Sequence, residues 1–170
     1  MSSHYNVTFN TQLRTDLSPI EVAALDYLFG ECDSPPSQFP DHWFFQQEEI
    51  TATAFWDLNH PVQYSVPGYI YRLWRSFDET NTQLTTCGVN IYLHGIKDSA
   101  LWSYCELLGL FGWLASLSVD HGLVGSHSVM DSVELIEAQT TTLYLIQDNE
   151  LFISTGQIGE CHSVMNSAKK

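Results

Sequence analysis

Apolar and polar side chains alternate in two parts of the chain, and this period of two predicts β-strands. In residues 4–13, Tyr5, Val7 and Phe9 share one face. Residues 69–96 alternate in the same way on both sides of the turn-rich segment DETNTQ, which predicts a β-hairpin. Its second strand directs four side chains toward the core and three away from it: Cys87, Val89, Ile91 and Leu93 inward, Asn90, Tyr92 and His94 outward.

The apolar period lengthens in residues 17–30, so this segment predicts an amphipathic helix. Ser18 is placed as the N-cap, Pro19 suits the first turn, and Glu21 completes a capping box with Ser18. Gly30 follows the last apolar position and predicts the end of the helix.

Residues 31–68 follow neither period. Pro35 and Pro36 forbid a regular element around them, although residues 50–58 have the composition of a strand. We expect an elaborated loop rich in proline and aromatic residues, and loops of this kind often carry function.

A long apolar segment, residues 100–118, predicts a second helix that is buried on most sides. One stripe of mostly small residues would let another backbone approach this helix: Ser103, Glu106, Gly109, Gly112 and Ser116. Residues 119–128 have the composition of a loop, and residues 132–139 and 140–155 that of strands. Asp148 and Asn149 suit a tight turn within the last of these.

This order of elements predicts an α+β fold, in which an antiparallel β-sheet carries two helices on one face, in addition to the Pro/aromatic-rich loop. The length of 170 residues predicts a single globular domain spanning residues 1–170.

The charge of the chain is strongly unbalanced. Twenty acidic residues against six basic ones give a net charge of −14. Neither Lys nor Arg occurs between Arg14 and Arg72 or between Lys97 and Lys169. A negative field of this kind repels nucleic acid and anionic membranes, and it speeds encounter with basic partners.

The compartment can be predicted from the N-terminus and the cysteines. The first residues, MSSHYNVTFN, lack the basic and apolar regions of a signal peptide. No CxxC motif occurs among Cys32, Cys87, Cys105 and Cys161, so we expect reduced, structural cysteines. These features predict a cytoplasmic protein that does not enter a membrane.

A short sequence is nearly repeated, as SHSVMDS at residues 126–132 and CHSVMNS at residues 161–167. His127, Asp131, Cys161 and His162 are residue types that bind transition metals. However, no spacing typical of a metal site is present, and a similar local structure explains the repeat equally well. We therefore expect no metal and no cofactor.

No catalytic signature is present. The chain has neither a GxSxG motif nor a phosphate-binding glycine loop, and its seven histidines are scattered. We therefore expect a protein that is not an enzyme.

These properties lead to the hypothesis of an acidic, non-enzymatic binding protein that neutralises a basic protein partner such as a toxin or nuclease. Immunity proteins, antitoxins and phage-encoded inhibitors share this composition. The acidic surface would steer the partner, and aromatic anchors would dock it. The residues expected to bind the partner are Asp131, Glu134, Glu137, Asp148, Glu150, Trp43 and Trp56.

Two alternatives remain open. One is a small-molecule-binding protein or enzyme with an aromatic pocket between the sheet and the 31–68 loop, in which His42 or His60 supplies polar groups. The other is a structural subunit, in which the small-residue stripe of the second helix packs against another chain.

Overall fold

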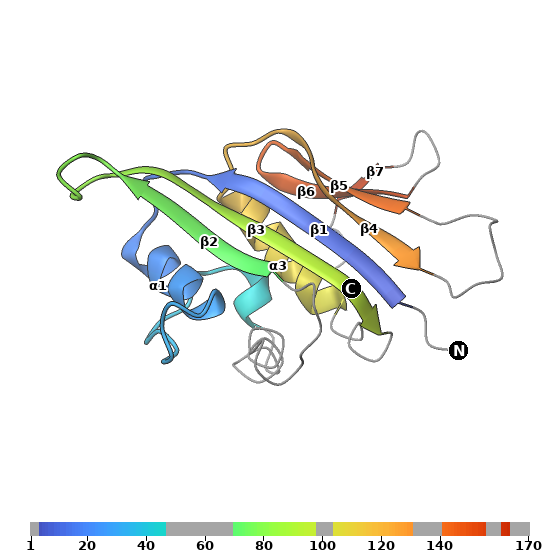
Figure 1. Ribbon diagram of the computed structural model, residues 1–170, viewed down its shortest axis with the longest axis horizontal. Coiled ribbons are helices and arrows are strands. Elements are labelled where there is room, and N and C mark those ends of the chain that lie inside the picture. Colours follow the sequence, from blue (N-terminus) through green and yellow to red (C-terminus); the bar gives the residue numbers. More distant parts are fainter. Residues whose placement is uncertain (1–3, 47–69, 98–103, 131–140, 156–160, 164–170) are drawn as a thin grey trace.

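The computed structural model describes residues 4–46, 70–97, 104–130, 141–155 and 161–163 (Figure 1). Its elements, in chain order, are β1 (His4–Leu13), α1 (Pro19–Leu28), the 3₁₀-helix η1 (Trp43–Gln46), β2 (Ile70–Phe77), β3 (Leu84–Lys97), α3 (Tyr104–Ser116), β4 (Gly122–Met130), β5 (Thr141–Gln147), β6 (Glu150–Thr155) and β7 (Cys161–Ser163).

The described strands form one antiparallel sheet in the order β2-β3-β1-β4-β5-β6-β7. In its first four strands, α1 connects β1 to β2 across β3, and α3 connects β3 to β4 across β1. This connectivity is that of two interleaved split βαβ units. β5, β6 and β7 then extend the sheet beyond β4 as a meander (Figure 1).

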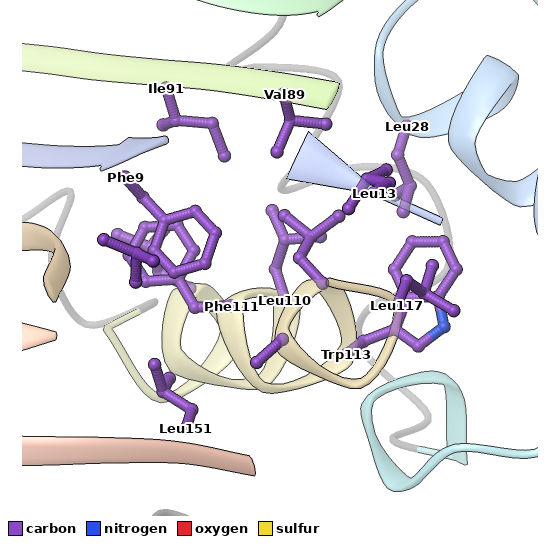
Figure 2. Close-up of a cluster of buried hydrophobic side chains, with 14 of the residues drawn as sticks. Phe9, Leu13, Leu28, Val89, Ile91, Leu110, Phe111, Trp113, Leu117 and Leu151 are labelled. Atoms are coloured by element: carbon purple, nitrogen blue, oxygen red, sulfur yellow. The ribbon is translucent and has the colours of Figure 1, made fainter. Parts of the chain in front are cut away.

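The two helices cover one face of the sheet, as the sequence predicts (Figures 1 and 2). Phe9 of β1 stacks on Phe111 of α3 with ring centroids 4.3 Å apart, and Tyr144 of β5 meets both rings edge-on. Leu25 of α1 belongs to the same buried cluster. The α+β fold with an antiparallel sheet and two helices on one face is therefore confirmed.

The limits of α1 follow its capping residues. The Ser18 hydroxyl accepts a hydrogen bond from the Glu21 backbone N–H at 3.3 Å, and the Glu21 carboxylate accepts one from the Ser18 backbone N–H at 2.7 Å. This is the predicted capping box. Gly30 has a φ of +76°, a conformation that glycine adopts without strain, and it follows the end of the helix.

The predicted hairpin is also present. β2 and β3 pair in antiparallel register from Ile70–Tyr92 to Phe77–Leu84. The four side chains expected to point inward from β3 are buried, whereas Asn90 and Tyr92 are exposed.

The prediction of a loop over residues 119–128 is wrong for most of that segment, because β4 begins at Gly122. Its glycines and serines have low strand propensity, but β4 lies between β1 and β5 and pairs with both. Gly125 lies so close to β1 that a Cβ atom there would clash with the Thr8 carbonyl oxygen. Pairing with distant strands therefore determines the conformation of this segment.

The expected strands at residues 50–58 and 132–139 lie outside the described residues, as do residues 47–68 of the 31–68 loop. The described part of each copy of the repeated sequence lies on a strand, residues 126–130 on β4 and Cys161–Ser163 on β7, and β5 and β6 separate these two strands. At about 4.8 Å per strand, this places the two backbones roughly 14 Å apart. The described parts of the two copies, which carry His127, Cys161 and His162, are therefore too far apart to bind one metal ion together.

Candidate functional site

Several connections of the sheet meet at one of its ends. Because the strands are antiparallel, the β1–α1, β2–β3, α3–β4 and β5–β6 connections all lie at the end where β1 finishes with Leu13. The strands themselves carry almost no negative charge: Glu150, the first residue of β6, is the only carboxylate in the described strands. The acidic residues of the described part of the chain therefore lie almost entirely in the connections and the helices.

The β5–β6 turn presents two of the acids that the sequence singled out. Asp148 and Asn149 have φ values of 50° and 62°, so both lie in the left-handed region. This combination is typical of the two-residue turns that connect twisted antiparallel strands, and the tight turn predicted here is confirmed. Asp148 and Glu150 are both exposed.

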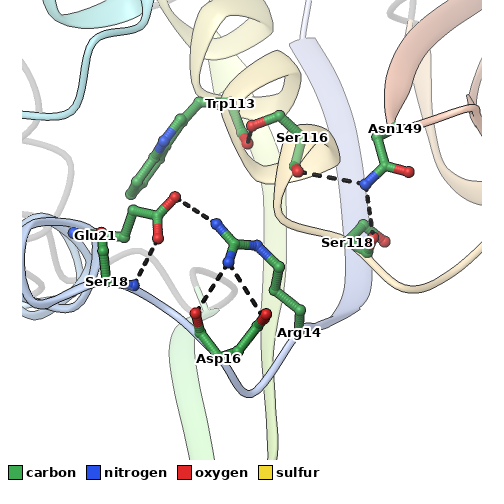
Figure 3. A network of polar contacts seen from close by, with 8 residues as sticks. All are labelled: Arg14, Asp16, Ser18, Glu21, Trp113, Ser116, Ser118 and Asn149. Atoms are coloured by element: carbon green, nitrogen blue, oxygen red, sulfur yellow. Dashed lines mark hydrogen bonds and ion pairs between the residues drawn. The ribbon is translucent and has the colours of Figure 1, made fainter.

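Asn149 fixes this turn to the C-terminal end of α3. Its side-chain amide donates to the backbone oxygens of Ser116 and Ser118, at 3.4 Å each (Figure 3). The turn is therefore held by a segment that lies far from it in the sequence.

A buried polar cluster fixes the α3–β4 connection to β1. The hydroxyl oxygens of Thr11 and Ser118 lie 2.6 Å apart, and both residues are buried. Asp120 accepts hydrogen bonds on Oδ2 from the Thr11 hydroxyl at 3.0 Å and from the Gln12 backbone N–H at 2.6 Å. Its own backbone N–H donates to Ser118 Oγ at 2.9 Å. Asp120 therefore positions this connection.

Two large apolar side chains are exposed beside these acids. Val119 is 47% exposed and Leu123 is 65% exposed. We call Val119, Asp120, Leu123, Asp148 and Glu150 together the acidic end. Exposed apolar groups surrounded by charged residues are typical of protein-binding surfaces.

A cavity of about 290 Å³ opens next to the acidic end. Its lining comes from the start of β4, the end of β5 and β6: His121, Gly122, Leu145, Ile146, Gln147, Asp148 and Phe152. The lining is mostly apolar, with polar groups contributed by His121, Gln147 and Asp148.

Positive charges do little to neutralise this surface. Arg14 donates to the Asp16 and Glu21 carboxylates at 3.2 and 2.6 Å (Figure 3), and Arg75 pairs with Asp26 of α1 at 2.6 Å. Two of the three arginines are therefore bound to acids outside the acidic end. Asp148 and Glu150 have no ion-pair partner among the described residues.

The β2–β3 turn adds a second acidic point at the same end of the sheet. Asp78 accepts backbone hydrogen bonds from Gln83 and Thr82 and a side-chain bond from Thr80. These bonds, above all the one from Gln83, lower the pKa of Asp78 to about 2. Asp78 is therefore ionised at any physiological pH.

Trp43, an expected anchor, lies mainly within the fold. Its ring packs over Gly109 of α3, and the side chain is half-buried. The neighbouring rings of Phe39, Phe44 and Phe45 pack on one another, and Phe45 also packs on Trp113. The small-residue stripe of α3 is thus occupied at Gly109 by side chains of the same chain. Trp56 lies outside the described residues.

The other acids expected to bind the partner, Asp131, Glu134 and Glu137, also lie outside the described residues. The strands that flank them, β4 ending at Met130 and β5 beginning at Thr141, meet at the opposite end of the sheet from the β5–β6 turn.

Val119, Leu123 and the cavity are not predicted by the sequence patterns. Both apolar residues belong to the segment VDHGLVG. An apolar residue within a polar, glycine-containing segment is the one sequence feature that could have indicated an exposed apolar side chain here. Val119 and Leu123 lie near Asp148 and Glu150 because β4 is next to β5 in the sheet.

The histidines do not form a metal centre in the described part of the chain, where no cluster of three or more His, Cys, Asp and Glu side chains occurs. His127 pairs with Val7 in register and is partly buried, and burial lowers its pKa. His42 accepts a hydrogen bond on Nδ1 from the Phe44 backbone N–H at 3.2 Å, which caps η1. Burial also lowers the pKa of His42.

Comparisons with known proteins give no relative. No protein-family model, no curated protein and no solved structure matches the chain. Among the described helices, none is both long enough and apolar enough to span a bilayer.

Proposed function

We propose that this chain is a non-enzymatic binding protein that neutralises a basic protein partner, in the manner of an immunity protein, an antitoxin or a phage-encoded inhibitor. One observation carries the proposal. Asp148 and Glu150 are exposed without an ion-pair partner among the described residues, next to the exposed apolar side chains of Val119 and Leu123.

Charge selects the class of partner. A protein of net charge −14 repels nucleic acid and other acidic proteins, and it attracts basic surfaces from a distance. The described strands carry almost no carboxylate. The negative electrostatic field is therefore strongest at the connections between the strands, and it would guide a basic partner toward them.

The apolar groups would supply the affinity. Exposed ion pairs contribute only about 0–1 kcal/mol each, whereas desolvated apolar anchors dominate most protein interfaces. Val119 and Leu123 are available for this role because the partner would cover them once the acids have oriented it. Trp43, Trp56, Asp131, Glu134 and Glu137 remain proposed contributors.

The proposal is tested by affinity capture from native lysate with wild-type protein and two double variants. Asp148→Lys/Glu150→Lys reverses two charges in the acidic end. Glu31→Lys/Asp33→Lys is the control, because it makes the same change of net charge in the loop that follows α1. The helix α1 itself lies beside β2, to which the Asp26–Arg75 ion pair connects it. We expect a stoichiometric basic protein that the wild type and the Glu31/Asp33 variant retain, that the Asp148/Glu150 variant loses, and that high salt releases.

A basic protein retained equally by both variants would remove the acidic end from the proposal. Failure of the wild type to retain any basic protein at low salt would overturn the proposed function.

A further inference from the structure

The cavity beside the acidic end is bounded by three adjacent strands. Gly122 of β4 pairs with Ile146 of β5, and Leu145 of β5 pairs with Phe152 of β6. Leu145, Ile146 and Phe152 make its apolar wall, and Asp148 adds a carboxylate where the β5–β6 turn begins. The lining of the cavity therefore contains both a carboxylate and an aromatic ring, two groups that attract a cation.

The size of the cavity limits what it can hold. Sites for drug-sized ligands and cofactors typically measure about 300–1,000 Å³. At about 290 Å³, and open to solvent, this cavity lies at the lower limit of that range. It fits one long side chain better than a cofactor.

The lining selects the chemistry of that side chain. An apolar wall favours a hydrocarbon stem, whereas the Asp148 carboxylate favours a positive charge at its end. The Phe152 ring attracts a cation placed over its face. A lysine or arginine side chain combines all three properties, and an acidic ligand would be repelled by Asp148 and Glu150.

The shape of the cavity is held by the fold. Gly122, at its β4 side, has a φ of +86°, and this left-handed conformation favours glycine. The β5–β6 turn on the other side is fixed to α3 by the two Asn149 hydrogen bonds. A site formed in this way before binding loses little conformational entropy when it is filled.

We propose that this cavity receives a lysine or arginine side chain of the basic partner, with its hydrocarbon stem on Leu145 and Ile146 and its charged group between Asp148 and the Phe152 ring. The proposal rests on the proposed function and adds the chemistry of the recognised group. Leu123, exposed next to the cavity, would lie under the backbone of the partner around that side chain.

Small probes test the cavity without the partner. Nα-acetyl-L-arginine amide and Nα-acetyl-L-lysine amide are titrated into isotope-labelled protein, with Nα-acetyl-L-norleucine amide as the uncharged control. We expect saturable shifts of the backbone amide signals of Gly122, Gln147 and Asp148 with the two cationic probes in the millimolar range. The signals of Asn90 and Tyr92, which are exposed on β3 and separated from β5 by β1 and β4, stay in place.

Two substitutions connect the shifts to named groups. Asp148→Asn removes the charge and is expected to raise the dissociation constant of the arginine probe about 2- to 5-fold. Phe152→Leu keeps an apolar side chain but removes the ring, and it is expected to raise this constant by a similar factor. Unchanged signals in the rest of the protein show that each variant is folded.

Equal shifts with the norleucine probe, or no saturable shift with either cationic probe, would overturn the cavity proposal. The two proposals fail separately. If the acidic end captures a basic protein but the probes do not bind, the cavity proposal falls and the function stands. If the probes bind but no basic protein is captured, the function falls and the cavity remains a site for cationic side chains.

Discussion

The side-chain amide of Asn149 donates to the backbone oxygen of Ser118 at 3.4 Å and thereby fixes the β5–β6 turn to the end of α3. The same amide reaches Ser116. These bonds connect the turn that carries Asp148 with the segment that leads to Val119.

Substitutions of Asn149 separate the turn geometry from these hydrogen bonds. Asn149→Gly keeps the left-handed φ of 62° but loses the bonds, so we expect the free energy of unfolding to fall by about 0.5–1.5 kcal/mol. Asn149→Ala also strains the backbone, which adds about 1 kcal/mol. Urea denaturation measures both values. Equal stability of the wild type and the glycine variant would show that the bonds contribute nothing.

Two glycines of α3 provide a matched pair for the packing of Trp43. A Cβ atom at Gly109 would lie 2.9 Å from atoms of Trp43 and Phe44, whereas one at Gly112 would lie 4.0 Å from the nearest atom of Trp43. We expect Gly109→Ala to lower the free energy of unfolding by about 1–3 kcal/mol through overpacking. Gly112→Ala should raise it by up to about 1 kcal/mol through helix propensity.

Urea denaturation of these two variants also tests the small-residue stripe. If Gly109→Ala were as stable as Gly112→Ala, Trp43 would not pack on α3 as described, and that part of the stripe would be open to another chain.

Asp78 gives a pH-dependent contribution to stability. Its pKa is lowered from 3.8 to about 2, so the folded state binds this proton less readily than the unfolded state. The contribution is complete above about pH 4 and is lost as the pH falls from 3.8 through 2. A carbon-detected NMR titration should place the pKa of this carboxyl near 2, and Thr80→Ala should raise it by removing one donor. A pKa near 3.8 in the wild type would contradict the hydrogen bonding described for this turn.

Cys32 and Cys87 should differ in reactivity. Cys87 is fully buried, and burial raises the pKa of its thiol, whereas Cys32 is exposed. We expect iodoacetamide at pH 8 to label Cys32 at least about 100-fold faster than Cys87, because Cys87 reacts only after the core opens. Peptide mass spectrometry at successive times measures both rates. Labelling of Cys87 at a rate similar to that of Cys32 would contradict its place in the core.

The features that the sequence predicts correctly are mainly local. The capping box of α1 depends on residues three positions apart, and the Asp148–Asn149 turn depends on two adjacent residues that tolerate a positive φ. The helix α3 (Tyr104–Ser116), which lies within the expected range 100–118, and the hairpin around residues 78–83 follow from their own apolar periods. Each can be predicted without knowing the rest of the fold.

The features that the sequence does not predict depend on strand order. β4 forms from a segment of low strand propensity because β1 and β5 lie on either side of it. Likewise, Val119 and Leu123 lie near Asp148 only because α3 leads into a strand next to β5. No local pattern indicates which connections meet at the same end of the sheet.

The central claim is that the acidic end steers and binds a basic protein, and the rate of association with the captured partner tests it most directly. The rate constant is measured at several salt concentrations for the wild type, for Asp148→Lys/Glu150→Lys and for Glu31→Lys/Asp33→Lys. We predict that at low salt the Asp148/Glu150 variant associates on the order of 10-fold more slowly than the Glu31/Asp33 variant, with a weaker dependence on salt. Equal rates and equal salt dependence for the two variants would contradict the claim.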